Sequence, residues 1–192
     1  RIRAILPSPG NTIRMRHLDR INQLQGRYER VSTDWTGVRN VTPKLFPEAD
    51  IIQLNWVSDF FEWDAFFDPS NLKNSPPIFW RLPDFQAITG GCHYFGSCDG
   101  YLKDCENCPQ IPRRRGVGNI AKENLIRRKK MFDLIPEGSL HFIAQSKWME
   151  QVLSQSPLSG KFPITRIPNG VDTSVFFPLD KAFCRDALGI SK

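Results

Sequence analysis

The sequence predicts an α/β fold: a Rossmann-like parallel sheet flanked by helices, with a cysteine-rich loop inserted into it. From residue 49 onward, short apolar runs alternate with segments of helical periodicity, which is typical of parallel βαβ units. Four of the five cysteines lie together between residues 89 and 110, among glycines and other turn-forming residues. A chain of 192 residues with 40% hydrophobic side chains can bury a sizeable core.

Four short runs have the composition of buried parallel strands. They are rich in β-branched and aromatic residues, and turn-forming residues separate them from their neighbours. The four runs are residues 49–56, 77–82, 140–144 and 163–167. After the last run, Pro168-Asn169-Gly170 predicts a turn with one residue in the left-handed conformation.

Five segments carry helical periodicity or helix-capping residues. They are residues 12–25, the aromatic segment 60–67 capped by Ser58 or Asp59, residues 117–134, residues 147–156 capped by Ser146, and residues 181–188 capped by Asp180, with Gly189 at the C-terminal end. Two sets of large side chains are expected to pack into the core and not to form a binding platform. These are Phe60, Phe61, Trp63, Phe66 and Phe67 in the aromatic segment, and Trp148, Met149, Val152 and Leu153 after Ser146.

The cysteine segment, residues 89–110, has the spacing C-x5-C-x6-C-x2-C. Its cysteines are Cys92, Cys98, Cys105 and Cys108. Four thiolates suit a tetrahedral Zn²⁺ site, which would be structural because no ligand position is left for a substrate. Disulfides, free thiols and an iron–sulfur remnant are the alternatives. His93 could replace one cysteine, and Cys184 is expected to be a small apolar packing residue.

The net charge of +6 is concentrated in one stretch. Residues 113–130 hold eight basic residues and one acid, Glu123, which gives a local balance of 8 − 1 = +7. This stretch is either a solvated helix face or a contact for an anionic ligand, an anionic membrane surface or nucleic acid. No run has the length of a membrane span.

Asp84 directly follows the second predicted strand. Ligands of open parallel sheets bind beyond the carboxyl ends of the strands, so Asp84 and the cysteine segment lie on the side where a site is expected. Asp84 could be a general base or a ligand anchor. An Asp after a proline is also a common turn residue.

Several segments together resemble the N-terminal domain of family-four glycosyltransferases, which are retaining enzymes of the GT-B type. The segments are ADIIQLNW (49–56), TGGCHYFGSCDGYLKDCENCPQ (89–110), AQSKW (144–148) and IPNGVDTSVFFP (167–178). The likeness covers residues 48–192 and is closest to the subgroup with a cysteine-rich insertion.

The resemblance implies an incomplete N-terminal domain over residues 1–178, with the insertion at 89–110. Residues 179–192 would be a linker and the start of a C-terminal domain. In such enzymes the N-terminal domain binds the acceptor, here a saccharide or a lipid-linked acceptor of cell-envelope glycan synthesis. The C-terminal domain binds most of the nucleotide sugar. A cytoplasmic protein, peripheral on the inner membrane face through residues 113–130, is expected.

The resemblance also implies roles for particular residues. Asp84 would be catalytic and face the cleft, Gly90 and Gly91 would bring backbone N–H groups to an anionic group, and Asn169 and Gly170 would border the cleft. Asp172 would support the turn that contains them.

Two motifs depart from the family. Gln53-Leu54-Asn55-Trp56 stands where the family has H-x-H-W, and Pro83-Asp84 stands where it has His-Asp. Proline cannot perform the role of that histidine, which fits either an altered acceptor site or a degenerate enzyme. The rival hypotheses are a zinc-stapled nucleic-acid-binding module, which the βαβ pattern disfavours, and a non-catalytic interaction domain.

Overall fold

A computed structural model describes residue 16 and residues 31–35, 37–111 and 119–190. The helix predicted over residues 12–25 lies outside these residues, apart from residue 16, and so does the first part of the basic stretch. The other predicted elements fall within the described ranges, apart from residues 117 and 118 at the start of the helix predicted over residues 117–134.

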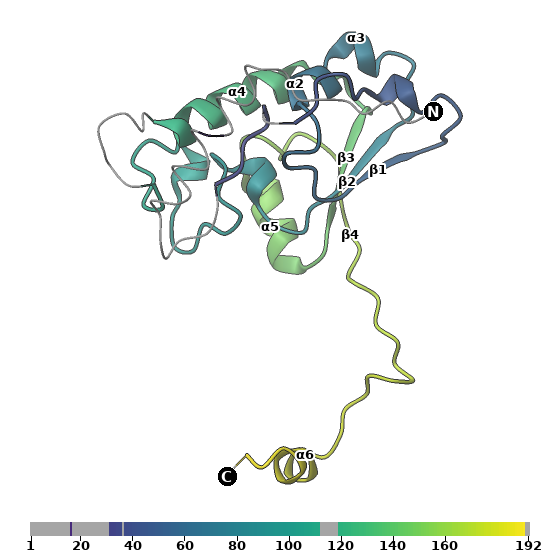
Figure 1. Cartoon of the computed structure of the whole chain (residues 1–192), viewed down its shortest axis with the longest axis vertical. Helices are drawn as coiled ribbons and strands as arrows, with labels where there is room; N and C mark the ends of the chain where they lie inside the picture. The colour runs from purple at the N-terminus through teal and green to yellow at the C-terminus, as the bar shows by residue number, and fades with distance from the viewer. Residues whose placement is uncertain (1–15, 17–30, 36, 112–118, 191–192) are drawn as a thin grey trace.

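Four parallel strands form one sheet in the order β1-β2-β3-β4 (Figure 1). The strands are β1 (Ile52–Leu54), β2 (Ile78–Arg81), β3 (Leu140–Ala144) and β4 (Ile164–Arg166). In the register, Leu54 pairs with Trp80, Trp80 with Phe142, and Phe142 with Ile164. The four predicted strands and the parallel α/β class are thereby confirmed.

One face of this sheet is buried and the other is half-open. Because the strand order follows the chain order, right-handed crossovers place the connections on the same face. The side chains toward that face are buried, and they are Ile52, Leu54, Ile78, Trp80, Leu140, Phe142 and Ala144. On the opposite face Phe79 and His141 are only partly buried and stack with their ring centroids 5.0 Å apart.

Five α-helices are described beside the sheet or after it (Figure 1). They are α2 (Trp63–Phe66), α3 (Pro69–Leu72), α4 (Ile120–Leu134), α5 (Lys147–Gln155) and α6 (Lys181–Ala187). Ser146 accepts a hydrogen bond from Met149 N, and Asp180 accepts one from Phe183 N, so both predicted caps are confirmed. The predicted capping of the aromatic segment by Ser58 or Asp59 is wrong. Its helix begins only after Glu62, and Asp59 is in the left-handed conformation with φ of 61°.

The aromatic core lies between the sheet and α2 and α4. Trp80 is its centre, because its ring packs against Trp63, Phe67, Phe132 and Phe142. All rings of the aromatic segment except one are buried as predicted, whereas Phe60 is 63% exposed. Trp148 is also exposed, since it lies on the first turn of α5 and turns toward the cysteine segment.

The chain continues beyond β4 in an extended conformation and ends in α6 (Figure 1). The left-handed turn predicted at Asn169-Gly170 is absent, because neither residue has a positive φ. No side chain of α6 is buried, and Cys184 is only partly covered. Gly189 has φ of 64° and ends this helix as predicted.

Candidate functional site

Polar side chains from three strands meet at the carboxyl edge of the sheet. Arg81, the last residue of β2, donates from Nη2 to Asn169 Oδ1 at 2.6 Å and from Nη1 to Asn55 Oδ1 at 3.4 Å. Asn55 follows β1, and Asn169 follows β4. The carboxyl ends of parallel strands lie at the same edge of the sheet. The Arg81 side chain can therefore bond the side-chain amides of Asn55, after β1, and Asn169, after β4.

Asp84 lies at the same edge and holds an imidazole. Its Oδ1 accepts from Gln86 N at 2.9 Å, and its Oδ2 accepts from His93 Nδ1 at 2.7 Å. The other ring nitrogen of His93, Nε2, lies 2.9 Å from Ser32 Oγ. In the neutral ring, an Nδ1–H that faces the carboxylate leaves Nε2 as the acceptor for Ser32 Oγ, and the two contacts hold the ring orientation.

An exposed indole borders this histidine. Trp56 follows Asn55 and is 63% exposed, and its ring meets the His93 ring edge-on at 6.0 Å with an interplanar angle of 70°. Trp80 Nε1 donates to the Asn55 carbonyl at 2.9 Å, which anchors the backbone next to Trp56 on the core. The site therefore combines a carboxylate, an imidazole and an open aromatic face.

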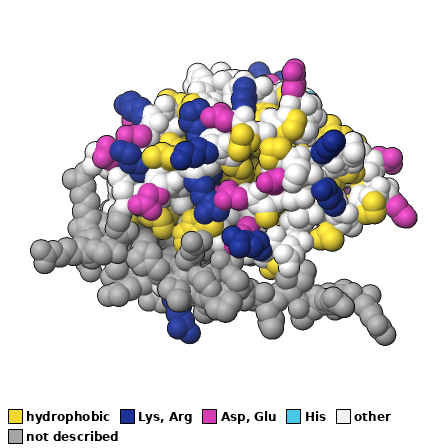
Figure 2. Space-filling model, turned by 90° about the horizontal axis from the view of Figure 1, so that it is seen from above, with side chains coloured by type: hydrophobic (Ala, Val, Ile, Leu, Met, Phe, Trp, Pro, Cys, Tyr) yellow, Lys and Arg dark blue, Asp and Glu magenta, His cyan; other side chains and the backbone are white. Residues whose placement is uncertain are grey.

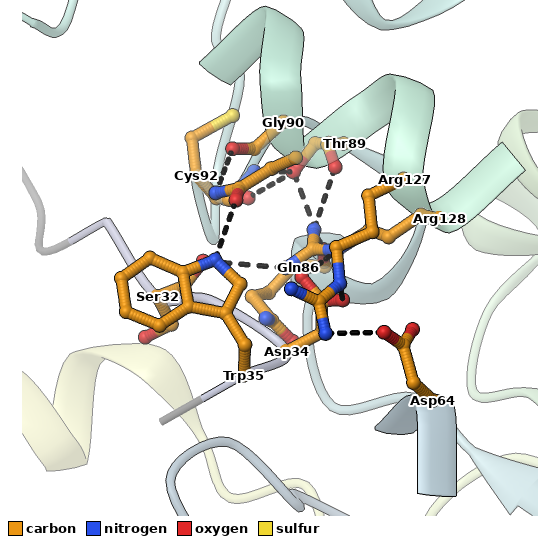
Figure 3. A network of polar contacts seen from close by, with 12 residues as sticks. Ser32, Asp34, Trp35, Asp64, Gln86, Thr89, Gly90, Cys92, Arg127 and Arg128 are labelled. Carbon is orange, nitrogen blue, oxygen red and sulfur yellow. Dashed lines mark hydrogen bonds and ion pairs between the residues drawn. The ribbon is translucent and has the colours of Figure 1, made fainter. Parts of the chain in front are cut away.

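Arg128, a fully buried arginine, bonds three backbone carbonyls around this site (Figure 3). Arg128 of α4 donates from Nη1 to the carbonyls of Gln86 and Thr89, the latter at 2.6 Å, and from Nη2 to the Ser32 carbonyl at 3.2 Å. Its guanidinium carbon also lies 4.8 Å from the centroid of the Trp63 ring. Arg128 thereby fixes the backbone of residue 32 against the loop that joins Asp84 to His93.

Asp34 compensates the charge of Arg128 within the protein. Its carboxylate lies 3.6 Å from Arg128 Nε and 3.1 Å from Arg127 Nε, and Arg127 Nη2 bonds Asp64 (Figure 3). Burial raises the pKa of Asp34, and the charges of Arg128 and Arg127 oppose that rise. Burial likewise lowers the pKa of Arg128, and the charge of Asp34 opposes this. Neither Nε makes a hydrogen bond to a described residue, so these contacts with Asp34 are ion pairs without hydrogen-bond geometry.

Packing and backbone conformation require glycine at positions 90 and 91. A Cβ at Gly90 would collide with the Ala121 backbone of α4, and Gly91 has φ of 124°. Gly91 N donates to Thr89 Oγ1 at 3.2 Å, and the Gly90 carbonyl accepts from Asn124 Nδ2 at 3.1 Å. Both residues are buried, Gly90 against the backbone of α4 and Gly91 against residues 31 and 32.

The other residues implied by the resemblance lie apart from His93. Asn169 reaches the carboxyl edge through Arg81, whereas Gly170 is exposed and a Cβ there would meet nothing within 4 Å. Asp172 is exposed and accepts from the N–H and hydroxyl of Ser174, so it supports a turn that follows Gly170.

The four cysteines of the cysteine segment border one cavity, and all are free thiols. Burial raises the pKa of Cys92 to about 11 and that of Cys105 to about 12, and the neighbouring cysteines add to both shifts. Within the described ranges, no three His, Cys, Asp or Glu side chains converge on a position that could hold a metal ion.

The cations in the described part of the basic stretch are mostly paired with acidic side chains of the same chain. Arg127 and Arg128 pair with Asp34, Lys129 pairs with Asp133, and Lys122 pairs with two acids of the cysteine segment, Asp104 and Glu106. On the face drawn in Figure 2, Lys and Arg side chains lie interspersed with Asp and Glu side chains. Residues 119–130 thus present no continuous cationic surface.

Sequence reasoning missed three residues of this site, of which His93 and Ser32 carry little signal. His93 is nine positions from Asp84, and only the fold of the loop brings the two together. Ser32 belongs to a turn-rich segment without periodicity. Arg81 could have been found, since it is the polar residue that ends an apolar strand.

The helices in the described ranges do not combine the length and hydropathy that a membrane span requires. Comparison with known proteins finds no matching family model, no matching curated protein and no matching solved structure.

Proposed function

We propose that this chain is the acceptor-side domain of a retaining GT-B glycosyltransferase, and that it binds a saccharide or lipid-linked saccharide at the carboxyl edge of its sheet. The observation that carries the proposal is the His93–Asp84 pair beside the exposed Trp56 ring. The resemblance in the segments 49–56, 89–110 and 167–178 supports the same function.

The chemistry of these groups suits a sugar. Sugar hydroxyls both donate and accept hydrogen bonds, and the C–H faces of a pyranose pack on aromatic rings. Asp84 and His93 Nε2 offer acceptors for sugar hydroxyls, and Trp56 offers the ring. Such a combination of an apolar surface with a few convergent polar groups is typical of small-molecule sites.

In this proposal His93 takes the role of the family histidine for which this chain has Pro83. Pro83 has no side-chain donor or acceptor, but the imidazole of His93 reaches the carboxylate of the adjacent Asp84 from within the cysteine segment. In this proposal Asp84 orients the ring, and His93 Nε2 accepts the proton of the acceptor hydroxyl. The hydroxyl oxygen bonds to the anomeric carbon of the donor sugar as the bond from that carbon to the diphosphate breaks. Ser32 Oγ, which now occupies Nε2, gives way to that hydroxyl.

The donor side belongs to the C-terminal domain that the resemblance implies. The nucleotide sugar would bind there, and basic groups of that domain would stabilise the leaving diphosphate. Nucleic-acid binding receives no comparable support, because the described cations of residues 119–130 are mostly paired with acids.

The proposal is tested by transfer of a labelled sugar from nucleotide sugars to lipid-linked saccharides, with the protein encoded by the complete reading frame. We expect His93→Gln and Asp84→Asn to lower kcat by about 100-fold or more, the range of general-base catalysis. Asp172→Asn, an exposed Asp that bonds only its own turn, serves as the matched control. Equal transfer by all four proteins would contradict the assignment.

A further inference from the structure

Four cysteines of the cysteine segment line a single cavity. Cys92, Cys98, Cys105 and Cys108 all line this cavity, whose volume is about 250 Å³. The chain between them is bent tightly, because a Cβ at Gly100 would lie 3.3 Å from Cys98 Sγ and 3.5 Å from Cys105 Cα. Cys184 lies on α6 and does not line the cavity.

A backbone N–H group is directed at one of these sulfurs. Gly100 N lies 3.4 Å from Cys98 Sγ. Donors placed around sulfur stabilise thiolates, and such bonds to the ligand atoms are a regular part of metal sites. A disulfide or an apolar packed thiol has no need of them.

Two further features fit an anionic cluster. Cys105 has φ of 53°, a left-handed conformation that a non-glycine residue keeps only where its surroundings hold it there. The buried guanidinium of Arg128 donates to the Thr89 carbonyl at 2.6 Å, and Thr89 Oγ1 donates to the Cys92 carbonyl at 2.7 Å. A cation shielded from solvent therefore lies near the start of the cysteine segment.

We propose that Cys92, Cys98, Cys105 and Cys108 together bind one Zn²⁺ ion in a structural site. Four thiols and Zn²⁺ would form a tetrathiolate centre of charge −2 and release four protons, with Zn–S bonds of about 2.3 Å. In the free-thiol arrangement the sulfurs do not yet converge, so they turn inward from the cavity wall when the ion binds.

The ion has a direct structural consequence for the candidate site. His93 follows Cys92 in the chain, so anchoring the Cys92 sulfur fixes the residue that holds Asp84. This consequence rests on the proposed function, whereas the zinc site itself does not.

Metal analysis of the purified 192-residue chain tests the proposal. We expect about one zinc ion per chain in the wild type and in Cys184→Ser, the matched control with its cysteine outside the cavity. Cys98→Ser and Cys108→Ser should lower the affinity for zinc by about 10-fold or more. Zinc loss in Cys184→Ser equal to that in Cys108→Ser would contradict the site.

Because a variant could fail to fold, the wild type supplies a second test. Protein stripped of metal and titrated with Co²⁺ should develop sulfur-to-cobalt charge-transfer absorption and the strong visible bands of a tetrahedral thiolate site. Added Zn²⁺ should abolish these bands. Absence of stoichiometric zinc and of cobalt bands, or two disulfides found by mass spectrometry without reduction, would overturn the proposal.

Discussion

The imidazole of His93 bonds the carboxylate of Asp84 with 2.7 Å between Nδ1 and Oδ2, although one belongs to the cysteine segment and the other follows β2. This bond joins the chain's most distinctive sequence feature to the carboxyl edge of its sheet. The cysteine segment therefore contributes a side chain to the candidate site in addition to bordering it.

The Ser32→Ala variant tests whether His93 serves saccharide binding or belongs to a serine-hydrolase triad. Ser32, His93 and Asp84 have the hydrogen-bond order of such a triad, but Ser32 is only 5% exposed. We expect the variant to retain saccharide binding within about threefold, because Ser32 only occupies Nε2 until a ligand arrives. Labelling of Ser32 by a fluorophosphonate would contradict this account.

Arg128→Met should strongly destabilise the fold. The change leaves the Asp34 carboxylate buried with a weaker partner, which costs about 3–5 kcal/mol in comparable buried pairs. Urea unfolding followed by circular dichroism measures the loss. Lys130→Met, at an exposed position of the same helix, should stay within about 0.5 kcal/mol of the wild type. Equal stability of the two variants would mean that Arg128 does not hold the network.

Gly90→Ala and Gly170→Ala form a matched pair. The first places a methyl group against the Ala121 backbone and should cost about 1–3 kcal/mol in the free energy of unfolding. The second meets nothing within 4 Å and should be neutral to about 0.5 kcal/mol. Loss of anion or acceptor binding in Gly90→Ala at full stability would instead support the anion-binding role that the resemblance implies.

The sequence predicts the sheet well because each strand is encoded locally. The apolar run 140–144 is β3, and Ser146 and Asp180 cap their helices as expected, since capping depends on neighbours within three residues. The failures at Phe60 and Asp59 arise where local periodicity is weak and the chain turns through a left-handed residue.

The site is predicted less well because long-range packing forms it. Asp84 is found from its place after a strand, but its bond to His93 depends on how a loop closes. Arg128 is the clearest example. In the sequence it is one cation of a basic stretch, whereas in the structure it is fully buried, with its charge directed at Asp34 and three carbonyls.

Trp56→Ala should weaken saccharide binding about tenfold, or ~1.4 kcal/mol, because the exposed ring is the apolar platform of the proposed site. Trp148→Ala is the control, since Trp148 is also exposed but packs against Phe85 and Phe95. Saturation-transfer NMR with a panel of oligosaccharides measures both affinities. Equal losses in the two variants would place the sugar elsewhere.

The most direct measurement is the NMR spectrum of the histidine rings during titration with an acceptor saccharide. The chain has three histidines, so His17→Gln and His141→Gln assign the signals. We predict that the His93 Nε2 resonance shifts on saturation, because the sugar hydroxyl replaces Ser32 Oγ, while the His141 resonances stay in place on the opposite sheet face. Saccharide binding that leaves the His93 ring unchanged would contradict the account.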